Sequence, residues 1–246
     1  MLQVCDVKKY FGGIKALDGT SLSLGYNELK CIIGPNGCGK STLFNVITGA
    51  MPPTSGQVIF KGENITARPP HKISRLGFGR KFQVPAIFND ISVAENVEIA
   101  AMAVQTKKSL WKTFSQKIDY TTFDKHLGNF GLTSYRNSLA GELPHGLKQR
   151  LEILLLIISE ANIILLDEPT AGMSQAETLE TAELIRHVQK NFLTSVLVIE
   201  HDMHFVRALN CPLIVMMKGS VVCEGVYETI KDDSEIKKAY LGEIAC

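Results

Sequence analysis

The sequence has little that would suit it to binding nucleic acid. Its 246 residues contain 26 lysines and arginines against 25 acidic residues, so the net charge is only +1, and no overall positive field would attract a polyanion. Aromatic residues make up 7 % of the chain and include one tryptophan, so platforms on which bases stack are not indicated either. A local basic patch is compatible with these numbers, but we expect no nucleic-acid partner.

The sequence also lacks paired cysteines. None of its six cysteines forms a CxxC pair, and no histidine cluster accompanies them. Three of them, Cys5, Cys31 and Cys211, lie in or beside apolar runs. We therefore expect small apolar side chains in a reducing compartment at positions 5, 31, 38, 211, 223 and 246.

A long uninterrupted apolar run is missing as well. The N-terminus has no charged segment followed by a long apolar stretch, so no signal peptide is indicated. The strongest apolar run, residues 153–166, contains Ser159, Glu160 and Asn162, whereas a membrane-spanning helix needs about 20 apolar residues. We expect this run to be the end of a buried helix, a short turn and a buried strand in a soluble protein. A docking surface would account for part of the apolar composition.

Short apolar or β-branched runs recur along the chain and predict an α/β fold. The runs near 163–167 and 196–200 are continuous rather than alternating, as expected for strands that are covered on both faces. A helical stretch at 176–190 has apolar residues at i, i+3 and i+4 spacing. This alternation predicts a mostly parallel central sheet, with strands at 2–7, 29–34, 56–60, 163–167, 195–200 and 213–217.

The middle of the sequence has a different pattern. Between about 91 and 160 no strong strand candidate occurs, and 92–104 and 146–159 are typical of helices. No internal repeat or low-complexity linker divides the chain. We therefore expect a single domain over 1–246, with an α/β core at about 1–87 and 161–246 and an inserted helical subdomain at about 88–160.

The segment "GPNGCGKS" at 34–41 matches the pattern G-x-x-x-x-G-K-[ST] and lies between an apolar strand and a helical stretch, the context that supports a phosphate-binding loop. Its glycines let backbone N–H groups face phosphate oxygens, and the helix adds its positive N-terminal end. We expect Lys40 to reach the terminal phosphates and the Ser41 hydroxyl to bind Mg²⁺. The predicted nucleotide contacts are Gly34, Pro35, Asn36, Gly37, Cys38, Gly39, Lys40, Ser41 and Thr42.

Cys38 lies inside this loop between two glycines. The loop N–H groups and the Lys40 ammonium would favour its thiolate. This predicts a reactive thiol that a bound nucleotide protects from alkylation. In the alternative interpretation, the side chain fills an alanine-sized position and points away from the phosphates.

Acidic residues and a histidine follow two of the predicted buried strands. Asp167 ends one strand, where its carboxylate would join the Mg²⁺ shell, and the adjacent Glu168 would polarise an attacking water. His201 follows the strand at 195–200 and is expected to sense the γ-phosphate. The alternatives are a strand that ends in solvated acids and a purely structural histidine.

In their order along the chain, these motifs resemble those of the ATP-binding subunits of ATP-binding cassette (ABC) transporters. The resemblance covers the whole chain and implies a P-loop NTPase (RecA-like) core with an N-terminal antiparallel β region. It implies that Phe11 stacks on adenine, with Tyr10 less favoured, and that Gln83 contacts Mg²⁺ or the attacking water. The motifs are the aromatic-glycine pair at 11–12, Walker A at 34–41, Gln83, the signature at 143–147, Walker B at 163–168 and His201.

Finer features resemble the importers for branched-chain amino acids and urea. These are the stretches "YFGGIKALDG", "DEPTAGMS" and the terminal "YLGE". The segment "GRKFQ" followed by P-x-x-F, the short helical insertion and "AGM" followed by "ETxxTAELI" look most like the urea-permease ATPase. The resemblance implies uptake of a small polar solute, with urea first and branched-chain or other amino acids as the alternative.

The resemblance also implies partners and a location. A second ATPase subunit is expected, as a heterodimer or a homodimer, together with membrane permease subunits and, indirectly, a solute-binding receptor. The chain would then lie on the cytoplasmic face of the plasma membrane as a peripheral subunit. The stretch at about 84–100 would contact the permease, with Ile87 and Phe88 as exposed apolar candidates. The alternative is that both residues belong to the core of the helical subdomain.

The signature departs from the family's usual Leu-Ser-Gly-Gly-Gln at Pro144 and Leu147, whereas a histidine at His145 is common in this branch. In the family this segment closes over ATP held by the partner subunit. Proline offers neither a hydroxyl nor an N–H, and a hydrogen bond to a charged group is worth about 1.5–3 kcal/mol. We expect a weakened rather than abolished contact from Leu143, Pro144, His145, Gly146 and Leu147.

Two rival interpretations stay open. A soluble ABC ATPase of repair or translation usually has tandem cassettes or coiled-coil insertions, and this chain has neither. A nucleotide-binding subunit that does not hydrolyse ATP is favoured by the altered signature, whereas Glu168 and His201 argue against it.

The chain departs from the family pattern at one more position, Ser174, where many relatives have an aspartate.

Overall fold

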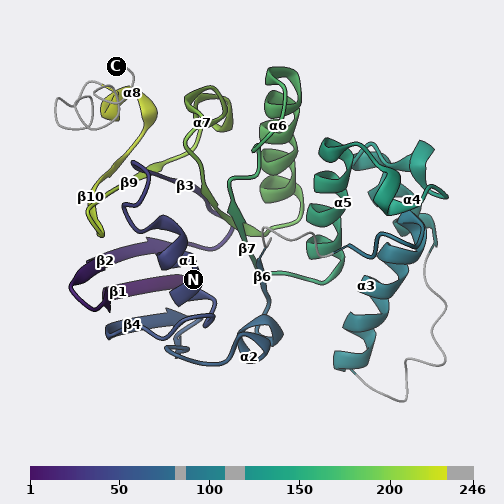
Figure 1. Cartoon of the computed structure of the whole chain (residues 1–246). Coiled ribbons are helices and arrows are strands. Elements are labelled where there is room, and N and C mark those ends of the chain that lie inside the picture. Colours follow the sequence, from purple (N-terminus) through teal and green to yellow (C-terminus); the bar gives the residue numbers. More distant parts are fainter. Residues whose placement is uncertain (81–86, 109–119, 232–246) are drawn as a thin grey trace.

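A computed structural model of the chain describes residues 1–80, 87–108 and 120–231 (Figure 1). This part of the chain forms two β-sheets, helices that pack on them, and a group of helices that stands beside the outermost strand of the larger sheet (Figure 1). The α/β class and the mostly parallel sheet expected from the sequence are confirmed.

The larger sheet has the strand order β10-β9-β3-β8-β7-β6. All neighbouring strands pair in parallel except β10, which is antiparallel to β9. The central strands β3, β7 and β8 are buried almost throughout because both faces of the sheet are covered. The strands are β3 (Leu29–Ile33), β6 (Phe78–Arg80), β7 (Ile163–Asp167), β8 (Ser195–Ile199), β9 (Leu213–Met217) and β10 (Ser220–Gly225).

The smaller sheet is antiparallel and has the order β2-β1-β4-β5. Its strand β2 contains Asp18, Gly19 and Thr20 and buries only one face, so no continuous apolar run marks it in the sequence. Pairing along β1 holds β2 in place instead. The strands are β1 (Leu2–Phe11), β2 (Ile14–Leu24), β4 (Ser55–Phe60) and β5 (Glu63–Asn64).

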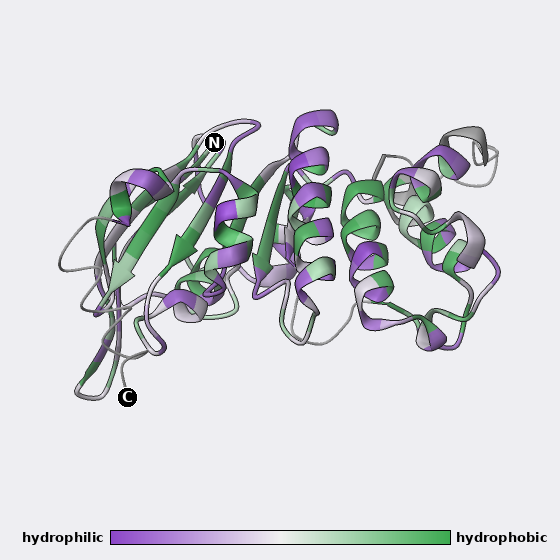
Figure 2. Cartoon of the chain, turned by 90° about the horizontal axis from the view of Figure 1, so that it is seen from above, coloured by the Kyte–Doolittle hydropathy of each residue, from purple (hydrophilic) through white to green (hydrophobic). Residues whose placement is uncertain are grey.

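The two faces of the large sheet belong to different apolar clusters. Ile32, Leu165 and Leu197 join a cluster with helix α1 (Lys40–Ile47) and the antiparallel sheet. Ile164 and Val198 point the other way, into a cluster with helices α5 (His145–Ile158), α6 (Gln175–Asn191) and α7 (Met203–Leu209). In Figure 2 the interior strands are accordingly largely hydrophobic, whereas the helices beside them carry both kinds of residue.

The helices of the middle segment form the group at the β6 side of the sheet (Figure 1). The predicted helices at 92–104 and 146–159 are confirmed as α3 and α5, and the described part of 91–160 contains no strand. The division into a core and a helical subdomain stays a prediction. The helices are α1 (Lys40–Ile47), α2 (Pro70–Arg75), α3 (Val93–Lys108), α4 (Tyr120–Asn129), α5 (His145–Ile158), α6 (Gln175–Asn191), α7 (Met203–Leu209) and α8 (Tyr227–Ile230).

The apolar run at 153–166 divides as predicted. Helix α5 ends at Ile158, a turn follows, and β7 begins at Ile163. Among the described residues, no helix is both long and apolar enough to cross a membrane.

Ser174, at a position where many relatives are expected to have an aspartate, is the N-cap residue of helix α6. The Ser174 hydroxyl accepts the backbone N–H of Glu177, and the Glu177 carboxylate accepts the backbone N–H of Ser174. The hydrogen bonds from Ser174 also lower the pKa of the Glu177 carboxyl. Serine therefore serves as an N-cap, a position for which aspartate is equally suited.

Replacing Ser174 with alanine should lower the free energy of unfolding by about 1 kcal/mol because the capping bonds are lost. The melting temperature should fall by about 2–4 °C for a chain of this size. Ser174→Asp should retain the wild-type melting temperature, and Ser23→Ala, an exposed serine on β2, is the matched control. Calorimetric unfolding of the three variants checks this, and equal melting temperatures for Ser174→Ala and wild type would contradict it.

Candidate functional site

The phosphate-binding loop joins the end of β3 to α1, and two of its positions accept only glycine. A Cβ atom on Gly34 would lie 2.2 Å from the carbonyl oxygen of Met216. A Cβ atom on Gly39 would lie 2.3 Å from the carbonyl oxygen of Ala16, and the φ angle of Gly39 is +109°. Gly37 has a φ of +75° but open space beside it. The loop therefore packs tightly on its inner side and is open where Gly37 lies.

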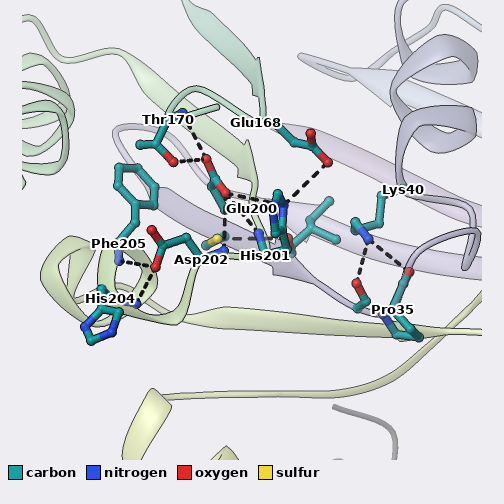
Figure 3. A network of polar contacts seen from close by, with 12 residues as sticks. Pro35, Lys40, Glu168, Thr170, Glu200, His201, Asp202, His204 and Phe205 are labelled. Carbon is teal, nitrogen blue, oxygen red and sulfur yellow. Dashed lines mark hydrogen bonds and ion pairs between the residues drawn. The ribbon is translucent and has the colours of Figure 1, made fainter. Parts of the chain in front are cut away.

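The positive charge of the phosphate loop is the ammonium group of Lys40. The Lys40 side chain is buried, and its ammonium donates to the carbonyl oxygens of Gly34 at 2.6 Å and Pro35 at 3.0 Å (Figure 3). No side chain of the described residues caps the N-terminus of α1, and its first turn has no acidic residue. The loop thus presents an ammonium group and uncapped N–H groups, which suits it to an anion.

Cys38 differs from the sequence prediction. Its side chain is buried in the apolar cluster behind the loop, and its Sγ atom would lie 2.7 Å from a Cβ atom on Gly34. Burial raises the pKa of the Cys38 thiol, and the nearby Lys40 ammonium only partly opposes this. The predicted favoured thiolate is therefore wrong, because desolvation outweighs the attraction to Lys40. The alternative of a side chain that points away from the phosphates is supported.

The end of β7 brings together the two described residues that were predicted to bind Mg²⁺. The Asp167 side chain is only 8 % exposed. Burial raises the pKa of its carboxyl and Glu168 adds to this, whereas Arg80, Lys40 and a hydrogen bond from Ser41 oppose it. The Ser41 hydroxyl thus lies near enough to influence the Asp167 carboxyl. The described residues contain no group of three or more His, Cys, Asp or Glu side chains that would hold a metal by themselves.

Arg80 is a part of the site that sequence reasoning missed. Its guanidinium donates to the side chain of Asn45 on α1 at 2.8 Å and to that of Thr48, the C-cap of this helix, at 3.0 Å. It also lies 3.8 Å from the Asp167 carboxylate. Arg80 thus connects the helix behind the phosphate loop to the carboxylate at the end of β7. The signal was its place in "GRKFQ", directly before the segment that carries Gln83, which lies outside the described residues.

Glu168 and His201 meet at the same edge of the sheet. The His201 Nδ1 atom lies 3.6 Å from the Glu168 carboxylate, and both side chains are well exposed (Figure 3). Glu168 has a φ of +47°, which an L-residue adopts only when its surroundings hold it there. The residue before His201, Glu200, is 1 % exposed and was also missed. Its "IEH" context follows a buried strand, and only the fold shows that the carboxylate turns inward.

The aromatic residues at the end of β1 differ in what they contact. Phe11 is 44 % exposed, with the Lys9 ammonium 5.1 Å from its ring centroid. The Tyr10 hydroxyl instead donates to the Asp18 carboxylate at 2.6 Å. Phe11 is therefore the more exposed of the two rings, and its stacking on adenine stays a prediction.

The signature segment forms the start of α5. Pro144 is the N-cap residue, and its carbonyl oxygen accepts the N–H groups of Leu147 and Lys148, both at 3.0 Å. The N–H groups of His145 and Gly146 lie in the first turn, where a helix offers them no acceptor. Leu143 is buried, and Leu147 packs on the core cluster. Leu147 thus has a packing role, while Pro144 and His145 are exposed.

Cys38 should resist alkylation in the folded protein, since it is buried and its thiol pKa is raised. Exposed Cys5 should react with iodoacetamide at least about tenfold faster at pH 8. Cys31 and Cys211 are also buried and should label as slowly as Cys38. Burial raises the pKa of both thiols, that of Cys211 to about 12. Mass spectrometry after timed labelling measures this. Fast labelling of Cys38 that ATP suppresses would contradict the buried geometry.

The chain matches known proteins over most of its length. A family model described as "ABC transporter" matches residues 17–171. BraF of Pseudomonas aeruginosa, a high-affinity branched-chain amino acid transport ATP-binding protein, is 34 % identical over 250 residues, covering 99 % of this chain and 98 % of the relative. LivG of Escherichia coli K12, described in the same terms, is 34 % identical over 251 residues with the same coverage.

A solved structure has the same fold. The ADP conformation of MJ1267, an ATP-binding cassette of an ABC transporter, superposes with a TM-score of 0.83 at 29 % identity and covers 98 % of both chains. The family match, the relatives and this structure together show that the chain belongs to the ATP-binding subunits of ABC transporters, in the branch that includes BraF and LivG, and is an ATPase coupled to transport.

Proposed function

We propose that the chain hydrolyses ATP to drive the import of a small polar solute. The main observation behind this proposal is that Lys40, Asp167 and the Glu168–His201 pair lie together at one edge of the sheet. The resemblance favours urea, but the relatives BraF and LivG are named for branched-chain amino acid transport. That naming supports branched-chain amino acids as the solute, with urea as the second candidate.

The nucleotide would lie against the phosphate loop. Its phosphates would accept the loop N–H groups and the Lys40 ammonium, which would exchange its carbonyl partners for phosphate oxygens. The adenine would stack on the exposed face of Phe11. The glycine positions that no other residue fits support this role, because they keep the loop backbone close to the sheet.

Ser41 and Asp167 are the proposed protein ligands of Mg²⁺. A hydroxyl and a carboxylate are the oxygen ligands that Mg²⁺ uses beside phosphates, and Gln83 is proposed as a further ligand. When bound, Mg²⁺ would neutralise charge on the phosphates. The nearby cations Arg80 and Lys40 favour the ionised carboxylate of Asp167 and so oppose the burial that raises its pKa.

Glu168 and His201 are proposed as the catalytic pair. Glu168 would accept a proton from water aligned with the γ-phosphate, and His201 would donate a hydrogen bond to that phosphate. Their exposure leaves room for a nucleotide and a second subunit to cover them.

The partners proposed are a second ATPase subunit, membrane permease subunits and, indirectly, a solute receptor. The chain would then be a peripheral subunit on the cytoplasmic face of the membrane. Exposed apolar residues on and before α3, namely Phe88, Ile99 and Met102, would contact the permease. Ile87 is 7 % exposed and packs in the core. The prediction that Ile87 is an exposed contact is therefore wrong, because its side chain points toward the helical group.

Glu168→Gln should retain ATP binding and lower hydrolysis by at least about a hundredfold, since only proton acceptance is lost. Uptake of radiolabelled leucine by cells that carry this variant should fall in parallel, while urea uptake tests the second solute. The matched control is Glu183→Gln on α6. Wild-type hydrolysis by Glu168→Gln would show that another group activates the water and that the role proposed for Glu168 is wrong.

Pro144→Ser should raise hydrolysis about ten- to a hundredfold at the site whose phosphate loop belongs to the partner, because the serine hydroxyl would reach the γ-phosphate. The site built on Lys40 of this chain should not change. Steady-state assays with Pro144→Ser, combined with loss of the loop lysine in one subunit at a time, separate the two sites.

An unchanged rate at both sites would mean that the N–H groups of His145 and Gly146 already supply the contact. A lower rate would mean that the rigid N-cap of Pro144 is what holds this loop in place.

A further inference from the structure

Glu200 is a buried charged residue to which the reaction as described assigns no role. It follows β8 directly and is 1 % exposed. A carboxylate removed from water is costly unless hydrogen bonds satisfy its oxygens. The contacts of Glu200 therefore show what the fold gains from keeping it there.

Each oxygen of Glu200 serves a different loop (Figure 3). Oε1 accepts the backbone N–H of Thr170 at 3.0 Å and the Thr170 hydroxyl at 2.6 Å. Oε2 accepts the backbone N–H of His201 at 3.0 Å and that of Asp202 at 3.4 Å. One carboxylate thus joins the loop after β7 to the loop after β8.

The loop after β7 needs such support. Glu168 has a left-handed backbone with φ of +47°, and its N–H donates to the carbonyl oxygen of Ile199 at 2.9 Å. Two residues later, Thr170 is held by Glu200, and between them the Pro169 carbonyl accepts a hydrogen bond from Gln149 of α5. A strained residue persists only where several contacts determine its position. Glu200 supplies two of these contacts.

Glu200 acts through backbone rather than by touching substrate. Its carboxylate is enclosed, and its distance of 3.8 Å from His201 Nδ1 is too long for a hydrogen bond. The bond to the His201 N–H instead fixes where the histidine leaves the strand. The same carboxylate, through Thr170, fixes where Glu168 leaves β7.

We propose that Glu200 is a positioning residue that holds Glu168 and His201 in register with each other across the ends of β7 and β8. The inference rests on the proposed catalytic roles of these two residues. In this proposal the Glu200 carboxylate sets the distance between Glu168, which would accept the proton of the attacking water, and His201, which would contact the γ-phosphate. ATP binding on the phosphate loop does not depend on it.

Glu200→Gln tests this with little change in volume. A carboxamide has one acceptor oxygen and one NH₂ group, so its NH₂ must face either the Thr170 donors or the His201 and Asp202 donors. One of the two loops therefore loses its hydrogen bonds to residue 200. We expect kcat to fall about ten- to a hundredfold, as for the loss of hydrogen bonds to a charged group, while the affinity for a fluorescent ATP analogue stays within about twofold.

Threonine variants provide a second, independent test. Thr170→Val removes the hydroxyl bond to Oε1 and should lower kcat about tenfold, and Thr170→Ser, which keeps the hydroxyl, should restore most of it. Thr194→Val is the matched control, because Thr194 is also buried but precedes β8, and its hydroxyl donates to the carbonyl oxygens of Ala161 and Phe192. It should hydrolyse ATP at the wild-type rate.

The assays use the full-length chain with the subunits that co-purify with it, and they include Glu168→Gln and His201→Ala. Wild-type kcat in Glu200→Gln overturns the proposal. The proposal is also overturned if Glu200→Gln loses ATP affinity by the same factor as kcat and melts at a lower temperature than wild type, since this result indicates a purely structural role. If Glu200→Gln does not fold, equal rates for Thr170→Val and Thr194→Val overturn it. Wild-type rates in both Glu168→Gln and His201→Ala would instead overturn the proposed function itself.

Discussion

Parallel pairing of β3, β8 and β7 is the constraint on which the site depends. In the register of these strands Ile32 lies opposite Ile199, and Ile199 lies opposite Asp167. Because the strands run the same way, the phosphate loop, the Asp167–Glu168 pair and His201 all leave the sheet at one edge. Reversing any one of these strands would carry its functional residues to the opposite edge.

The same edge gathers charged groups that are shielded from water. Lys40 donates to loop carbonyls, Asp167 lies beside Arg80, and Glu200 accepts N–H and hydroxyl groups from two loops. Each of these charges would be costly if it were buried alone. The partners of Asp167 and Glu200 come from other strands and loops, so these two charges are stabilised only when the strand ends are assembled.

Much of the fold could be predicted because local pattern and burial agree. The runs that became β3, β7 and β8 are apolar without interruption, and both faces of the sheet that contains them are covered. Strand β2 and the short strand β6 have no such run. They are strands because β1 and β7 pair with them. The partner of β2 is its neighbour across the turn at Gly12 and Gly13, whereas the partner of β6 lies about 80 residues further along the chain and leaves no local signal.

The sequence by itself identified the phosphate loop and the strand-end residues Asp167, Glu168 and His201, because each motif is contiguous and follows an apolar run. The roles of these residues in hydrolysis stay predictions. Tertiary structure decided the rest. Cys38 turned into the core, where desolvation outweighs Lys40. Glu200 turned inward beside His201, because Thr170 offers donors from another loop. The direction of a side chain depends on neighbours that only the folded chain brings together.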